Sequence, residues 1–262
     1  MQIVSLSPSL TEILVALGVH EELVGVTDSC EINATPHPSL SPKGGEGWGE
    51  GESFTRIGPS KALNTAKIDR LLPEMILADA YDNRPEEVGR LAKKWRTKLF
   101  EVKGLEGVCD TIRDLGRLLG KKEKADPLIQ MIRDEMATSG KIFPKEMKKR
   151  TVILLWNGPY LTVNFDTYPS RLVEAAGGLN VFRSESLREF PVELEDVIEK
   201  DPEVLLLAGE PGPFQKRHIA EFRRYRILSR IPIHLVKGEL LARYGMKTVE
   251  ALKQLRKIYE AL

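Results

Sequence analysis

The chain opens with a β-rich apolar run at residues 2–6, a break at Ser7-Pro8-Ser9, and a segment with helical spacing. Apolar residues between 10 and 17 recur at positions that fall on one face of a helix. Ser9, followed three residues later by Glu12, has the pattern of a capping box, which predicts that Ser9 caps this helix. The opening segment therefore predicts a strand that leads into a helix.

The alternation of strands and helices continues through the first hundred residues. Gly18 is expected to end the first helix. Later patterns predict strands at 23–26, 75–78 and 99–102, and helices at 65–72 and 85–99. Strands separated by helices are typical of a parallel sheet that is covered on both faces.

Small polar residues follow several of these predicted strands. In open α/β folds, ligands bind beyond the carboxyl ends of the strands. The segments at these ends carry Ser7, Pro8, Ser29, Cys30 and Asp79, so these five residues are candidates for contact with a ligand. The alternative is that they form ordinary strand-to-helix turns, which occur in every α/β fold.

The middle of the chain has a helical pattern only. One apolar face runs through residues 105–119, and a second helical pattern covers residues 125–142. A helix of about 20 residues spans about 30 Å, the width of a small domain, so this helix is expected to link two lobes. The Lys-rich run at 145–150 is interpreted as its solvated end, with a basic docking patch as the alternative.

A second α/β series follows. It comprises predicted strands at 151–156, 161–164, 204–208 and 233–236, and predicted helices at 169–176, 194–200, 214–224 and 248–262. The predicted fold class is α/β: two α/β lobes with parallel sheets, joined by one long backbone helix as a clamshell. The expected divisions are an N-terminal lobe at 1–104, a helical segment at 105–148 and a C-terminal lobe at 149–262.

Residues 33–55 are rich in Pro and Gly and nearly free of aliphatic residues, which predicts a long flexible insertion. Trp48 lies in its middle, and we interpret it as part of an exposed loop, with a ligand-stacking ring as the alternative. His37 has no partner at metal-ligand spacing.

The composition of the chain excludes several classes of function. The 262 residues include 39 basic and 38 acidic side chains, and a net charge of +1 gives no reason to expect a nucleic-acid partner. No apolar run is long enough to span a bilayer, and no export signal precedes the first strand. The expected location is cytoplasmic as written, or periplasmic or membrane-associated if the true start lies upstream. Two cysteines predict free thiols, and we expect a monomer without an intrinsic cofactor or metal site.

Several segments resemble a known family. They are IVSLSPSLTEILVALG with VGVTDSC near the start, LVEAAGGLNVF in the second half, and FPVELEDVIEKDPEVLLLAG before the last strand. The chain resembles the cobalamin-binding and iron-chelate-binding proteins of ABC importers, in which one long helix joins two α/β lobes. The resemblance implies non-catalytic binding of a small molecule, a corrinoid such as cobalamin or another metal chelate, in a cleft between the lobes.

The resemblance also assigns ligand contacts. Trp156 matches an aromatic residue of the corrinoid site, and Glu239 and Arg243 match a ligand-touching pair in the C-terminal lobe. A flat macrocycle needs a stacking ring, and its polar rim needs donors and acceptors. From the residues alone, Trp156 reads instead as a core residue at a strand end. Ser29, Ser60 and Asp79 stand where a cobalamin receptor offers large aromatics, so the ligand is left open between a corrinoid and another chelate.

Docking on the permease of the importer is the second implication of the resemblance. Glu195 matches the glutamate that the C-terminal lobe presents to the permease, whereas Ala66 occupies the matching position in the N-terminal lobe. Glu86 or Glu87 is the candidate to replace it, although neither falls at the matching position.

Two other functions compete with binding. Cys30 lies beside Asp28 and Glu31, so it is a candidate nucleophile of an enzyme, or a metal or axial ligand. Against the enzyme, no histidine is expected near Cys30, and against a metal site, no second soft ligand is near in sequence. A protein-binding scaffold that uses the basic runs at 145–150 and 223–230 ranks lowest, because such runs are usually solvated.

Overall fold

The computed structural model describes residues 1–30 and 54–262. Most of the predicted insertion, with His37 and Trp48, lies outside the described residues. The chain divides into two compact units. Unit 1 comprises Met1–Val102 with Gly107–Ile129, and unit 2 comprises Lys103–Glu106 with Gln130–Leu262.

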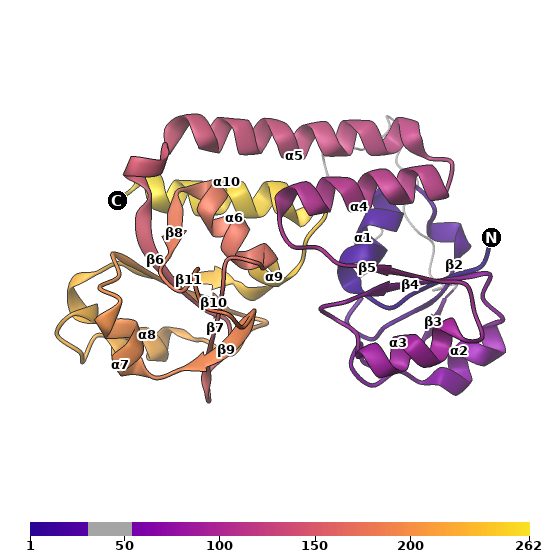
Figure 1. The fold of residues 1–262 in the computed structure, drawn as a ribbon, viewed down its shortest axis with the longest axis horizontal. Helices are drawn as coiled ribbons and strands as arrows, with labels where there is room; N and C mark the ends of the chain where they lie inside the picture. Colours follow the sequence, from indigo (N-terminus) through magenta and orange to yellow (C-terminus); the bar gives the residue numbers. More distant parts are fainter. Residues whose placement is uncertain (31–53) are drawn as a thin grey trace. The chain divides into compact units, whose positions relative to one another are not determined.

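Unit 1 is built on a five-stranded parallel sheet in the order β3-β2-β1-β4-β5. Its strands are β1 (Ile3–Ser5), β2 (Leu23–Val26), β3 (Thr55–Arg56), β4 (Met75–Asp79) and β5 (Thr97–Phe100). Its shorter helices are α1 (Pro8–Ala16), η1 (His20–Glu22), α2 (Thr65–Leu71) and α3 (Pro85–Ala92). Helices α2 and α3 cover one face of the sheet, and α1 and α4 (Leu105–Leu118) cover the other (Figure 1).

Apolar side chains explain why α2 and α3 pack on their face. The buried cluster there is Val4, Leu6, Ile57, Leu63, Ile68, Ile76, Ala78, Val88 and Leu91. Alternate residues of β1 and β4 point into this cluster, and the residues between them are buried against the opposite face. A strand that is buried on both faces reads as a continuous apolar run, as β4 does.

Three boundary predictions in unit 1 were wrong. The helix α1 begins at Pro8 with Ser7 as its N-cap, because proline lacks an N–H and its fixed φ suits the first helical position. The helix α3 ends at Ala92, and the half-polar edge strand β5 begins at Thr97, where a helix was predicted. Thr55, assigned to the insertion, is the first residue of β3.

Helices α4 and α5 (Lys122–Ile142) follow unit 1's sheet, and α5 begins in unit 1 and ends in unit 2. Their close approach within unit 1 depends on Gly116, where an added Cβ would lie 2.5 Å from the Cβ of Ala125. None of the described helices, α5 included, is long and apolar enough to cross a bilayer.

Unit 2 contains a four-stranded parallel sheet in the order β11-β10-β6-β8 and an antiparallel pair, β7 with β9. The strands are β6 (Lys149–Leu154), β7 (Tyr160–Val163), β8 (Gly178–Asn180), β9 (Glu189–Val192), β10 (Val204–Gly209) and β11 (Ile233–Lys237). The helices are η2 (Lys145–Met147), α6 (Tyr168–Ala176), α7 (Leu194–Glu199), α8 (Lys216–Phe222), η3 (Leu228–Arg230), α9 (Gly238–Ala242) and α10 (Lys247–Glu260). The parallel sheets of the two units confirm the predicted α/β class.

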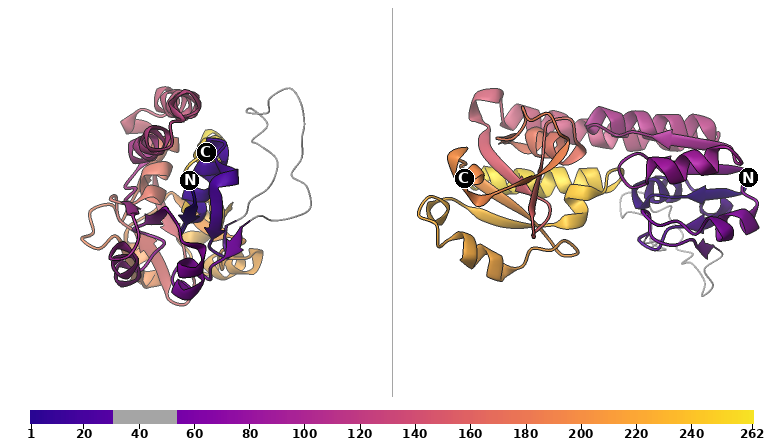
Figure 2. Two further views of the ribbon diagram at one scale, coloured as in Figure 1. Left: turned by 90° about the vertical axis from the view of Figure 1, so that its right-hand side faces the viewer. Right: turned by 60° about the horizontal axis from the view of Figure 1, so that its bottom comes forward.

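The two faces of the unit 2 sheet are covered by different helices. Helix α10 packs beside α6 on one face, as the further views in Figure 2 show. Helices α7 and α8 cover the other, over an apolar cluster that includes Val197, Phe214 and Phe222. The strands β8 and β9 and the helix α9 were not predicted, since each is too short to show a periodicity.

The Lys-rich run at 145–150 does not simply end the long helix. Lys149 and Arg150 open β6, and both lie near acidic side chains of the neighbouring loop. The Arg150 side chain donates to Asp201, and its backbone N–H donates to Glu203 at 2.9 Å. These contacts explain why two charged residues begin a central strand.

Candidate ligand-binding site

The strand ends of unit 1 bring the predicted N-terminal candidates to one edge. Strands β1 to β4 are adjacent and parallel, so the loops after their carboxyl ends lie side by side. The strand ends and the segments that follow them carry Ser7, Pro8, Ser29, Cys30 and Asp79. The structure therefore places all five at one edge, but their side chains differ in what they present.

Asp79 is buried and supports the loop after β4. One of its carboxylate oxygens accepts the backbone N–H groups of Tyr81 at 2.8 Å and Asp82 at 3.1 Å. The Asn83 amide oxygen accepts the Asp79 N–H at 2.8 Å, and its NH₂ donates to the Leu6 carbonyl at 2.8 Å. Such carboxylate-to-backbone bonds are typical of turns, so this carboxylate shapes the edge.

The two serines of this edge differ in exposure. Ser7 is buried with Pro8, and its hydroxyl donates to Asp82 at 2.5 Å and makes no cap bond to α1. Ser29 is exposed, and its hydroxyl lies 3.3 Å from that of Ser60 on the neighbouring loop. Ser29 is thus the better placed of the two to meet a ligand.

Cys30 is 2% exposed, and its sulfur lies 3.2 Å from the Thr11 hydroxyl and 3.1 Å from the Thr27 hydroxyl. Burial raises the pKa of this thiol, and the opposing effects of the two hydroxyls and of Arg56 do not cancel that rise. A protonated, enclosed thiol is a poor nucleophile. Within residues 1–30 and 54–262, no three His, Cys, Asp or Glu residues gather in a way that would hold a metal ion.

Tyr81 was not among the predicted site residues. Its ring is 39% exposed on the loop after β4, and the Lys61 ammonium lies 6.0 Å from the ring centre. An aromatic residue two positions beyond a fully buried strand was a usable signal in the sequence. Tyr81 is thus an exposed aromatic side chain at the edge where Ser29 and Asp79 carry none.

In unit 2, Trp156 lies in the turn between β6 and β7 and is 51% exposed. Its backbone pairs with Leu161, which fixes the turn, while the indole remains open to solvent. The reading of Trp156 as a core residue was therefore wrong. The amide of the next residue, Asn157, lies 3.3 Å from Nε2 of His218 on α8.

Glu239 and Arg243 lie at the start and just after the end of α9. Their charged groups are 3.8 Å apart, and the Lys247 ammonium donates directly to the Glu239 carboxylate. Burial would raise the pKa of Glu239, but the hydrogen bond and charge of Lys247, with the charges of Arg243 and Lys237, lower it overall. Nothing in the sequence indicated that Lys247 contacts Glu239, because the turn at Gly245, and not helical spacing, brings the two side chains together.

The three residues considered for permease docking occupy the same position in three different helices. Glu195 is the second residue of α7, Glu86 the second of α3 and Ala66 the second of α2. All three are exposed. Glu86 thus presents a carboxylate from unit 1 at the same kind of helix start as Glu195 in unit 2.

Comparisons with known proteins agree with this architecture. A family model described as periplasmic binding protein matches residues 3–233. The vitamin B12-binding protein of Salmonella typhimurium is 23% identical over 255 residues, covering 97% of this chain and 88% of that protein.

Two solved structures share the fold. The crystal structure of the periplasmic vitamin B12 binding protein BtuF of Vibrio cholerae has a TM-score of 0.78 at 21% identity, covering 99% of this chain and 96% of that chain. The periplasmic heme-binding protein RhuT from Roseiflexus has a TM-score of 0.75 at 20% identity, covering 99% and 98%. These relatives are binding proteins, and the family model matches most of the described sequence. The chain belongs to the periplasmic binding protein family.

Proposed function

We propose that this protein is the substrate-binding component of an ABC importer and that it binds a corrinoid or another metal chelate without changing it chemically. The observation that carries the proposal is the exposed indole of Trp156, held by a paired turn at a strand end of unit 2. The resemblance assigned a stacking role to this residue. Relatives that bind vitamin B12 and heme support the ligand class.

The chemistry of the neighbouring groups suits such a ligand. A flat macrocycle gains from stacking on an aromatic face, which Trp156 offers in unit 2 and Tyr81 in unit 1. The polar rim of the macrocycle needs charged donors, and Arg243 is already oriented by Glu239 at 3.8 Å. That the ligand lies between the lobes stays a prediction.

Docking and location belong to the same proposal. Glu195 and Glu86 are the carboxylates that would meet cations of the permease, since both are exposed at helix starts. The cytoplasmic location expected from the sequence finds no support in the comparisons, because the similar solved structures are periplasmic proteins. We infer that the protein works on the outer side of the membrane.

The test is to mix the purified protein separately with cobalamin, cobinamide and haem, and to record absorption spectra after gel filtration. Co-elution of one chromophore at a 1:1 ratio is expected. Absence of all three from the protein peak would place the ligand outside the tetrapyrroles, which would overturn the corrinoid assignment and leave a metal chelate of another kind, such as a siderophore complex.

Trp156→Ala localises the binding. Loss of one stacked ring costs about 1–2 kcal/mol, so affinity for the retained chromophore should fall about tenfold. Phe165→Ala is the matched control, because this ring is similarly exposed, at 40%, beyond the other end of β7. Equal affinity of the two variants would remove Trp156 from the site.

A further inference from the structure

A strongly basic segment covers residues 216–230 of unit 2. It comprises α8, the turns that follow it and η3. The segment has one carboxylate, Glu221, and six cations, which are Lys216, Arg217, Arg223, Arg224, Arg226 and Arg230. These seven groups give the segment a net charge of +5, whereas the whole chain has +1, so the other residues together carry −4. Positive charge is therefore concentrated in this basic segment.

Buried side chains hold the basic segment on unit 2. Phe222 and Leu228 belong to the apolar cluster under α7 and α8, and His218 is 7% exposed. All six cations are exposed. The cations are thus displayed on the surface of a packed element.

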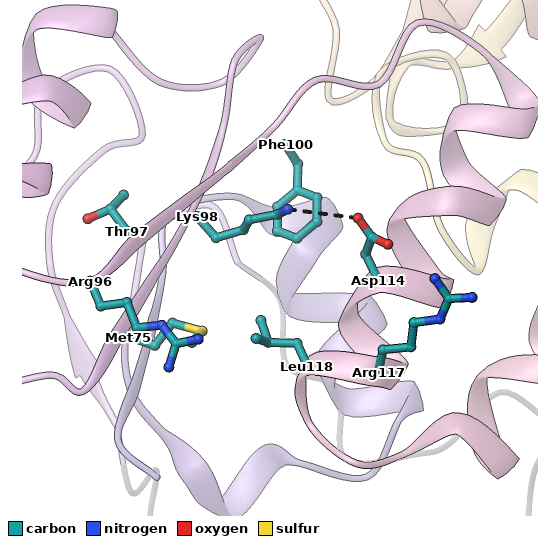
Figure 3. A pocket seen from close by; sticks show the side chains of 8 residues that line it. All are labelled: Met75, Arg96, Thr97, Lys98, Phe100, Asp114, Arg117 and Leu118. Atoms are coloured by element: carbon teal, nitrogen blue, oxygen red, sulfur yellow. Dashed lines mark ion pairs between the residues drawn. The ribbon is translucent and has the colours of Figure 1, made fainter.

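Most cations of the basic segment have no partner. Within residues 1–30 and 54–262, the charged groups of five of the six form no ion pair or hydrogen bond, and the exception is Arg217, whose Nε lies 3.3 Å from Nε2 of His218. By contrast, Lys98 of β5 points across a hollow of unit 1 to Asp114 of α4, 3.8 Å away (Figure 3). The charges of the basic segment are therefore available to an anionic partner.

Two exposed apolar residues lie among these cations. Tyr225 and Ile227, in the turns between α8 and η3, are 42% and 41% exposed. Tyrosine is favoured at the level of lipid headgroups, and an aliphatic side chain gains from contact with the acyl boundary. Five of the six cations are arginines, whose guanidinium groups bind phosphate oxygens through paired hydrogen bonds. This combination suits a surface that offers phosphate groups above an apolar layer, whereas a nucleic acid offers the phosphates without that layer.

We propose that the basic segment binds the surface of a bilayer that contains anionic phospholipids. Its arginines pair with lipid phosphate groups, while Tyr225 and Ile227 enter the headgroup region. Helix α8 shares its apolar cluster with α7, which carries the proposed docking residue Glu195, so contact with a permease would bring the basic segment toward the surrounding lipid. Lipid binding itself does not depend on the proposed function, because vesicles without a permease or ligand test it.

The test is co-sedimentation of the full chain with lipid vesicles. Vesicles of phosphatidylcholine with about 30% phosphatidylglycerol should bind the protein at low salt at least about tenfold more tightly than vesicles of phosphatidylcholine alone. Added salt should release the protein, because it screens exposed charges. Absence of binding to the anionic vesicles, or equal binding to both kinds, would overturn the proposal.

Charge variants locate the contact. Arg224→Gln/Arg226→Gln should lower the partition coefficient on anionic vesicles at least about tenfold. The matched control is Lys253→Gln/Lys257→Gln, which removes the same charge from exposed positions of α10, on the opposite face of the unit 2 sheet. The control should bind as the unaltered protein does, and equal losses for the two variants would remove the basic segment from the contact.

Ile227→Ser distinguishes a bilayer from other polyanions. The variant should bind anionic vesicles about fivefold more weakly, because an apolar contact is lost, while its binding to heparin, a soluble polyanion, should not change. Vesicle binding as tight as that of the unaltered protein would mean that charge alone acts, and would overturn the bilayer assignment.

Discussion

Buried polar side chains determine the shape of the strand-end edge in unit 1. The Asn83 amide bridges Leu6 and Ser60 and also accepts the Asp79 N–H, while two threonine hydroxyls enclose the Cys30 sulfur. Buried polar groups need such partners, because each unsatisfied group costs about 1–3 kcal/mol. At the scale of single residues, these groups hold the loops on which Ser29 and Tyr81 are exposed.

Cys30 should react slowly. Its burial and raised pKa keep it protonated at pH 7.5, so alkylation by iodoacetamide in the folded protein should be at least about tenfold slower than in urea. Peptide mass spectrometry would report the modified fraction over time. Rapid labelling of Cys30 with an apparent pKa below neutrality would instead restore the enzyme hypothesis.

Glu239 should contribute pH-dependent stability. Its pKa is lowered in the folded state, so its contribution is present above the unfolded value of about 4.3 and is lost as the pH falls through the folded value. Glu239→Gln should therefore lose less stability than the unaltered protein between pH 6 and pH 3, by less than about 1 kcal/mol after solvent screening. Urea midpoints at both pH values measure this.

The control for this measurement is Glu199→Gln, which alters an exposed carboxylate at the end of α7. It should keep the pH dependence of the unaltered protein. If Glu239→Gln behaves in the same way, the contact with Lys247 contributes nothing to stability.

At the scale of elements, the packing of α4 on α5 within unit 1 depends on the absence of a side chain at Gly116. Gly116→Ala would place a methyl group 2.5 Å from that of Ala125, so the helices must separate. The expected destabilisation is about 1–3 kcal/mol, measured by urea denaturation.

Gly140→Ala is the matched control in the same helix pair. A Cβ there meets nothing within 4 Å, so alanine should stabilise α5 by up to about 1 kcal/mol through its higher helix propensity. Opposite signs for the two substitutions are the prediction. The same sign for both would mean that Gly116 is not a close-contact position.

At the scale of the whole molecule, the proposed importer function requires that exposed carboxylates meet a permease. Glu195→Lys should weaken association with the permease in reconstituted vesicles about tenfold, since reversing a rim charge adds repulsion. Glu199→Lys, on the same helix, is the control and should have little effect. An effect of equal size for both would indicate general charge attraction, and added salt should then abolish it.

The sequence by itself determined the α/β class and most of the regular elements. Strands β4 and β10 are buried on both faces and therefore have continuous apolar runs, and α4 has one apolar face. Both patterns can be read as local periodicity along the sequence. The family resemblance rested on contiguous segments, so it too was readable along the chain. Short edge strands such as β5 and β8 were misread or missed, because three or four partly polar residues show no period.

Only the tertiary structure decided which side chains are available to a ligand. Strand order places the loops after β1 to β4 together, yet the turn bonds bury Asp79 and the two threonines enclose Cys30. The tertiary structure also leaves Trp156 exposed and brings Lys247 to Glu239. Each outcome depends on contacts between distant residues and on side-chain direction, and neither property is expressed in local sequence periodicity.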